Sequence, residues 1–432
     1  MLSKKRLRDH DGPTPRPTKQ PKNSEVTVKL SVGLALDVLS MNLDERTWYH
    51  WSRTCRRNRD TALSIPGLTG TCFQWNQHLK DLHIRSPIQF RRMDATHWAG
   101  QDLSDFQHME HLTSLDMGIH SVQDVDLRPL STIGSLTELT IRALSYGPYY
   151  GALDLAPIID LPNLRLLTIC DLTLHLDLGP LVSVSSLEHL VLNNIPWPAG
   201  SWGEMAQLTT LSLTDICQST TASLQELRAL VHLTSLHLDT LQVTNLDVLS
   251  NLIDLEVLSL TDLQITSLDA VGSCMKLRTL IVNDCRKVRD INPALVSPVL
   301  TTLSLIRIGD LRESRHPITP IRKIPLHVTT LCLHCVTIDI SAFDGLLDLQ
   351  TMCIACLHGP ENAFRYILTH LDILPQLRNL AIHGPEYVDV RLQNPPPNTV
   401  YPNTKNHAKW LGCHSDIPMR LHHHMRVIEK YS

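Results

Sequence analysis

A short apolar motif recurs along the chain, and no other feature of the sequence constrains the fold as strongly. The motif reads apolar-x-x-apolar-x-apolar, and successive copies begin between 21 and 28 residues apart. Tandem units of this length indicate a solenoid, because one unit cannot bury its apolar side chains alone. A weaker copy begins at Leu79. Twelve clear copies begin at Leu112, Leu136, Leu164, Leu187, Leu208, Leu233, Leu255, Leu277, Leu300, Val328, Leu349 and Leu377.

Each copy predicts one short strand, whose places we number from the first apolar residue. The residues at the fourth and sixth places, such as Leu211 and Leu213, point to one side of an extended chain. The third, fifth and seventh places point to the other side. Stacked strands therefore form a parallel sheet with a leucine core on one face and a concave outer face. Between strands we expect one short helical turn, and Asp154 and Asp177 precede two such turns, where a carboxylate caps free N–H groups.

This array resembles the leucine-rich repeat family over roughly residues 112–385. The resemblance implies an α/β solenoid of about 12 repeats, with the parallel sheet on its concave face. The array departs from the family at the ninth place, which usually carries Asn or Cys. That place is apolar in most copies, for example at Ile195 and Ile216, and only Cys285 keeps the usual choice. The asparagine ladder that normally satisfies backbone groups is therefore mostly absent.

Composition and charge exclude several other classes of protein. Aromatic residues make up only 5% of the chain, which disfavours a β-sandwich. No uncharged apolar run reaches about 18 residues, so we expect no membrane span. The net charge of -4 provides no general attraction to nucleic acid. The first residues lack the apolar core of a secretion signal, and the eleven cysteines are odd in number, so we expect an intracellular protein, cytoplasmic or nuclear, with reduced thiols.

Residues 29–65 differ from the array and predict two short helices. Apolar residues at helical spacing come first, an acidic turn follows, and a second amphipathic stretch ends in Cys55-Arg56-Arg57. This pattern resembles an F-box, although Ala35 stands where the usual Pro would be and Asn58 where a Trp is usual. The resemblance implies docking to a Skp-type subunit through Leu36, Asp37, Val38, Leu39, Leu43, Trp48 and Cys55. The alternative is a plain helical cap on the first repeat, which an open solenoid end requires in either case.

The sequence predicts five segments. Residues 1–28 form a disordered basic tail, whose Lys/Arg cluster is either a nuclear import signal or a solvated tail. Residues 29–65 form the F-box-like module, and residues 66–111 form a transition and N-terminal cap. Residues 112–385 form the repeats. Residues 386–432 form a rigid, unpaired Pro-rich linker and a polar, histidine-containing tail.

The concave face is expected to contact a protein partner. Its fifth-place residues are small and nearly uncharged, whereas phosphate binding would need a stripe of Arg and Lys. Nucleic acid is therefore a disfavoured ligand. Asp171, Asp215, Asp262 and Asp284 follow the strands at equivalent positions, and we interpret them as local turn residues in preference to an acidic edge for a basic partner. The candidate contact residues are Asp116, Thr140, Thr168, Ser212, His237, Ser259 and Ser304.

Four cysteines at Cys332, Cys335, Cys353 and Cys356 have the spacing of a four-thiolate zinc site. The repeat register disfavours that site, because strand residues three apart lie on opposite faces and about 10 Å apart. We predict instead that Cys332 and Cys353 are neighbouring exposed thiols on adjacent coils. The chain carries no recognisable catalytic motif, so we expect no enzyme activity, no cofactor and no metal.

The sequence thus predicts a protein-binding adaptor. If the F-box resemblance holds, it implies a substrate-recognition subunit of a cullin ubiquitin ligase, with the Skp-type subunit and cullin complex as partners and an unknown protein as substrate. The alternative is a leucine-rich repeat scaffold or regulator with no link to a ligase.

Overall fold

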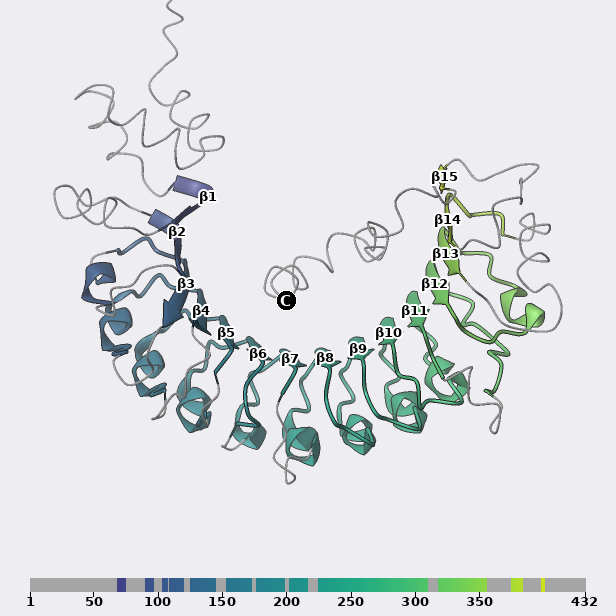
Figure 1. Ribbon diagram of the computed structural model, residues 1–432, viewed down its shortest axis with the longest axis horizontal. Helices are drawn as coiled ribbons and strands as arrows, with labels where there is room; N and C mark the ends of the chain where they lie inside the picture. Colours follow the sequence, from purple (N-terminus) through teal and green to yellow (C-terminus); the bar gives the residue numbers. More distant parts are fainter. Residues whose placement is uncertain are drawn as a thin grey trace, which may run out of the picture.

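The computed structural model describes twelve segments of the chain. They are residues 68–74, 90–96, 103–107, 109–119, 125–144, 153–172, 176–198, 202–216, 224–309, 318–355, 374–383 and 398–400. The described coils stack into an arc, with the strands along its inner side and the helical turns along its outer side (Figure 1). Residues 29–65 lie outside these segments, as does the weak copy at Leu79.

Within the described residues, fifteen strands form one sheet in strict chain order, and every neighbouring pair is parallel. The strands are β1 (Leu68–Gln74), β2 (Phe90–Ala95), β3 (Ser114–Ile119), β4 (Glu138–Ala143), β5 (Leu166–Cys170), β6 (His189–Asn193), β7 (Thr210–Thr214), β8 (Ser235–Asp239), β9 (Val257–Thr261), β10 (Thr279–Asn283), β11 (Thr302–Ile306), β12 (Thr330–His334), β13 (Thr351–Ala355), β14 (Asn379–His383) and β15 (Asn398–Val400).

The twelve predicted copies coincide one for one with β3 to β14, which confirms the solenoid and its parallel concave sheet. The sheet also extends past the predicted array, through β1 and β2 on one side and β15 on the other. The expectation of a fully unpaired Pro-rich linker is wrong at its end, because Asn398 pairs with Asn379. A sheet edge offers free N–H and C=O groups. Proline has no backbone N–H, so the chain can donate hydrogen bonds to that edge only after the three prolines.

The helical elements between the described strands are single 3-10 turns. The predicted α/β solenoid therefore has little helix among the described residues. Prediction and structure agree on the capping aspartates. Asp154 accepts the N–H of Ala156 at 2.9 Å, and Asp177 accepts that of Gly179 at 2.8 Å. The turns are η1 (Leu103–Phe106), η2 (Arg128–Thr132), η3 (Ala156–Asp160), η4 (Gly179–Ser183), η5 (Trp202–Glu204), η6 (Leu224–Ala229), η7 (Asp247–Asn251), η8 (Asp269–Ser273), η9 (Asn292–Leu295) and η10 (Ile340–Phe343). None of the helices among the described residues combines the length and the apolar character needed to cross a membrane.

A continuous leucine core fills the space between the sheet and the turns. In the coil that begins at Leu208, the first, fourth and sixth places have no exposed surface, and Leu227 of the following turn packs into the same core. Burying one such side chain contributes about 1.5–3 kcal/mol. Because each coil shares its core with the next, the stability of the array grows with the number of neighbours.

Two other devices satisfy the backbone where the asparagine ladder is missing. The eighth-place residue adopts a left-handed conformation, as in Asp215 with φ 48° and Asp262 with φ 47°. Its N–H then donates to the next coil, from Asp215 to the Asp239 carbonyl at 2.9 Å. Threonine hydroxyls at the second place also donate across coils, for example from Thr234 to the Thr209 carbonyl at 3.1 Å.

Candidate functional site

The fifth-place residues of the concave face are more deeply buried than their polar character suggests. Parallel strands lie about 4.8 Å apart, and inward curvature brings neighbouring side chains closer still, so small side chains at the centre of the strand are shielded. The third and seventh places, such as Thr210 and Thr214, are partly exposed. The exposed fractions are 8% for Thr140, 0% for Thr168, 1% for Ser212, 7% for His237, 7% for Ser259 and 1% for Ser304.

Asp116, the remaining predicted contact residue, is held by an ion pair within the sheet. Arg142 on β4 donates to both carboxylate oxygens of Asp116 on β3, at 3.2 and 2.8 Å. Both side chains are less than one-fifth exposed. That the fifth-place residues bind a partner stays a prediction, and the partly exposed third and seventh places offer such a partner more surface.

An acidic edge borders the concave face at the ends of β7 to β9. Asp215, Asp239 and Asp262 follow one another on successive coils. Burial raises the pKa of Asp239, and the negative charges of Asp262 and Asp215 raise it further. The left-handed backbone explains why Asp recurs at the eighth place, because Asp and Asn tolerate this conformation better than most residues. The structure therefore supports the interpretation as turn residues.

On the coil of β10, two arginines neutralise the equivalent aspartate, Asp284. Arg286 donates a hydrogen bond to Asp284, and Arg307 approaches the same carboxylate at 3.2 Å. The hydrogen bond from Arg286 and the charges of both guanidinium groups lower the pKa of Asp284. Of the four aspartates Asp215, Asp239, Asp262 and Asp284, only Asp284 takes part in an ion pair among the described residues.

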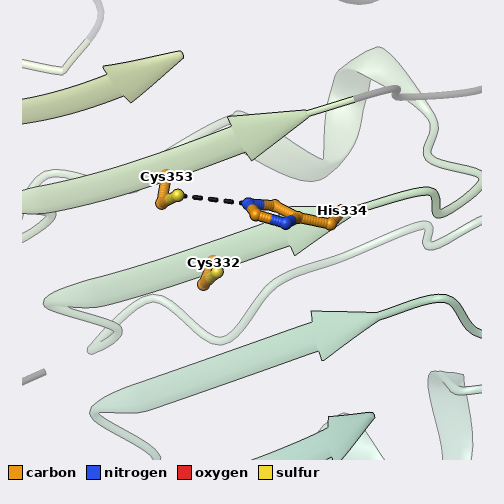
Figure 2. Close-up of side chains that lie close together, drawn as sticks. All are labelled: Cys332, His334 and Cys353. Atoms are coloured by element: carbon orange, nitrogen blue, oxygen red, sulfur yellow. Dashed lines mark hydrogen bonds between the residues drawn. The ribbon is translucent and has the colours of Figure 1, made fainter. Parts of the chain in front are cut away.

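A cluster of two thiols and one imidazole lies further along the same face. Cys332 and His334 occupy the fifth and seventh places of β12, and Cys353 occupies the fifth place of β13. Cys332 and Cys353 are direct register partners. Figure 2 shows the His334 ring extending from β12 toward Cys353, and its Nε2 lies 3.1 Å from the Cys353 Sγ. Both cysteines are partly buried, and the three potential ligand atoms lie within 4.8 Å of one another.

The cluster changes the acidity of its thiols. A hydrogen bond with Cys353 holds the pKa of Cys332 well below its usual value, and His334 lowers it further through a hydrogen bond and its charge. These effects outweigh the burial of Cys332, which opposes ionisation. One proton is thus readily lost from the pair, and a thiolate is both the nucleophilic and the metal-binding form of cysteine.

The core thiols have the opposite chemistry. Burial raises the pKa of Cys170 to about 12, of Cys274 to about 11 and of Cys285 to about 12. Cys285 instead makes a weak contact from its Sγ to the Leu260 carbonyl, at 3.8 Å. These three cysteines behave as small apolar residues.

The register argument against a four-thiolate site agrees with the placement of Cys335, which has left the strand with φ 50° and does not belong to the cluster. Cys356 lies outside the described residues. The predicted neighbourhood of Cys332 and Cys353 is confirmed, but they are partly buried, not exposed. Sequence reasoning missed His334, although period-2 alternation places it on the same face as Cys332. The F-box-like residues Leu36 to Cys55 all lie outside the described residues.

Comparisons with known proteins identify similar repeat structures but no family profile. No protein-family profile matches the chain, and no curated protein sequence is significantly similar to it. An internalin of Listeria monocytogenes has 18% identity and a TM-score of 0.43, covering 74% of this chain and 88% of its own. A leucine-rich repeat protein of Leptospira interrogans has 15% identity and a TM-score of 0.43, covering 82% and 98%. A TLR13–ssRNA13 complex has 16% identity and a TM-score of 0.48, covering 76% and 54%.

The molecule's own geometry defines its class. Leucines recur at fixed places, each coil contributes one strand to a single parallel sheet, and a short turn closes the coil on the outer side. These features are those of a leucine-rich repeat solenoid.

Proposed function

We propose that this chain is a protein-binding scaffold that holds its partner against the concave face. The observation that carries the proposal is the concave face itself, which spans twelve successive strands. Polar, partly exposed residues follow one another at the seventh place of β6 to β10: Asn193, Thr214, Asp239, Thr261 and Asn283. Strands about 4.8 Å apart and five residues long cover about 800 Å². That area equals what one protein contributes to a standard protein–protein interface. The described residues of β3 to β14 carry no stripe of positive charge, which a nucleic acid partner would require.

The acidic edge refines the expected partner. Asp215, Asp239 and Asp262 lie at the ends of the central strands, and no ion pair among the described residues includes them, whereas Arg286 pairs with Asp284. A partner with basic residues at this edge would relieve their mutual repulsion, and steering by complementary charge would speed its association.

Affinity capture with concave-face variants tests this function. Thr214→Arg and Thr261→Arg place a long charged side chain at partly exposed seventh places. We expect recovery of the partner to fall at least about 10-fold, since about 1.4 kcal/mol of lost binding energy has that effect. Ser273→Arg, on the outer turn η8, is the matched control and should bind as the unaltered chain does. Equal recovery with all three variants would remove the concave face from the proposal.

We further propose that the F-box-like segment connects the scaffold to a cullin ubiquitin ligase. Support comes from the residues of the two predicted helices, including Leu36, Leu39, Trp48 and Cys55. The scaffold would then hold a substrate while the ligase acts on it, so its contribution to the reaction would be positioning.

Capture of the Skp-type subunit by the full chain tests this finer proposal. Leu39→Asp and Trp48→Ala should abolish the capture, while the partner of the concave face should still bind. Failure of the unaltered chain to capture any Skp-type subunit would favour the scaffold with no ligase link. In that case deletion of residues 25–60 should lower the stability of the array and change no ligase association.

A further inference from the structure

Among the residues that the structure describes, one group of three potential metal ligands converges, and it belongs to the concave face. The group consists of Cys332, His334 and Cys353. The proposal for this group does not depend on the proposed protein partner, because it rests on ligand chemistry and distances. The ligands come from adjacent strands that are paired in register, so the backbone holds them at a constant separation.

We propose that Cys332, His334 and Cys353 bind one thiophilic transition-metal ion of the zinc type. The ligand atoms are the two Sγ atoms and the His334 Nε2. Three protein ligands leave the fourth tetrahedral position for a water molecule or for a group that a bound partner supplies. Both thiols release their protons when the metal binds, because the coordinating form of cysteine is the thiolate.

The distances suit such an ion. Zinc–sulfur bonds of about 2.3 Å and zinc–nitrogen bonds of about 2.0 Å place tetrahedral ligand atoms about 3.6–3.8 Å apart. The three atoms here lie within 4.8 Å of one another, and the His334 Nε2 lies 3.1 Å from the Cys353 Sγ. Side-chain rotations that move these atoms by about 1 Å or less would therefore complete the site. Figure 2 shows that the three side chains lie close together on β12 and β13, which are paired in register.

The ligand types select the class of metal. Thiolates and imidazole favour zinc, copper(I) and related ions, whereas magnesium and calcium require oxygen ligands. The thiols are also dispensable for the fold, because Ser212, Ser259 and Ser304 occupy the same fifth place in other coils. Folding alone therefore does not explain why two neighbouring coils carry cysteine at this place.

Cobalt(II) titration of the full chain tests the site directly. The chain is purified in a non-thiol reductant, treated with chelator and titrated with Co²⁺, whose thiolate charge-transfer absorption distinguishes sulfur ligands from the histidines of the C-terminal tail. We expect one equivalent of Co²⁺ with thiolate absorption, displaced by one equivalent of Zn²⁺. We expect Cys332→Ser or Cys353→Ser to weaken binding by at least about 100-fold, since loss of even an outer-shell partner costs about 10- to 100-fold.

Two further variants make the result specific. His334→Gln should retain thiolate absorption but weaken binding and change the spectrum, because one nitrogen ligand is lost. Cys335→Ser removes a thiol of the same coil that lies outside the cluster, and it should leave the titration unchanged. Equal circular dichroism spectra for all variants would show that the serine substitutions leave the fold intact, as serine at the same place in other coils suggests.

Three outcomes would overturn the proposal. The first is the absence of thiolate absorption in the reduced, unaltered chain. The second is binding by the variant Cys332→Ser/Cys353→Ser that equals binding by the unaltered chain. The third is an equal loss with Cys335→Ser, which would indicate the four-thiolate arrangement that the strand register disfavours.

Discussion

Cys285 and Cys332 have identical side chains, but the solenoid gives them opposite chemistry. Cys285 lies in the core with no exposed surface, and burial raises its pKa to about 12. Cys332 lies on the concave face, where Cys353 and His334 lower its pKa. The difference follows from the face of the coil that each place occupies. A thiol at a core place packs as a small apolar side chain. A thiol at a concave place lies beside polar groups of the adjacent coils.

The strongest contrast is expected between two neighbours on one strand. Leu331→Ala should lower the free energy of unfolding by about 2–5 kcal/mol, because Leu331 is fully buried and its loss leaves a cavity. Cys332→Ala, one residue further along β12, should cost less than about 1 kcal/mol. Urea denaturation followed by circular dichroism measures both. Equal losses would mean that the concave face carries as much packing energy as the core.

Thiol reactivity should separate the same two regions by at least about 100-fold, because two pKa units change the thiolate fraction by that factor. In the metal-free chain at neutral pH, iodoacetamide should modify Cys332 or Cys353 well before Cys274 and Cys285. Peptide mass spectrometry over time gives the rate at each residue. One equivalent of Zn²⁺ should protect the concave thiols and leave the slow rates of the core thiols unchanged. Similar rates for both groups would contradict the contrast.

A hydroxyl in place of each thiol should sharpen the comparison. Cys285→Ser should lower the free energy of unfolding by about 1–3 kcal/mol. The substitution places a polar hydroxyl in an apolar space, where the hydroxyl is a poor replacement for the thiol and its weak contact with the Leu260 carbonyl. Cys332→Ser should cost about 0.5 kcal/mol or less, since the neighbouring coil already carries Ser304 at that place. Thermal unfolding of the two variants under metal-free conditions checks this difference. A larger loss for Cys332→Ser would reverse it.

The core thiols should also make the fold sensitive to alkali. The folded pKa of Cys285 is raised from 9.0 to about 12, so the thiol stays protonated in the folded chain while it ionises in the unfolded chain. Its stabilising contribution is complete below pH 9 and is lost as the pH rises toward 12. The loss should be about 1.4 kcal/mol per pH unit. Cys285→Ala should reduce the slope of stability against pH by this amount, measured by urea denaturation between pH 9 and 11, and parallel curves would contradict it.

Much of the fold follows from local patterns in the sequence. The spacing of Leu208, Leu211 and Leu213 defines a strand, its buried side and the start of the next unit, because alternation and repeat length are properties of the chain itself. The capping roles of Asp154 and Asp177 are equally local, since each carboxylate binds an N–H two residues away. The pairing of Cys332 with Cys353 also follows, because equal places in successive coils become neighbours.

Other features depend on how the coils stack. Sequence pattern placed Thr168 and Ser212 on the concave face, but the proximity of neighbouring strands decides that they are almost fully buried. The pairing of β15 likewise depends on a free edge being within reach of the chain.

The sequence by itself determined the number of central coils, the face of each strand residue and the alignment of the two concave cysteines. Tertiary structure alone decided that His334 reaches across to Cys353 and that the cluster is partly buried. The reason is physical: repeat periodicity defines the order of neighbours along a coil, whereas distances between side-chain atoms depend on the spacing, twist and curvature of the assembled sheet.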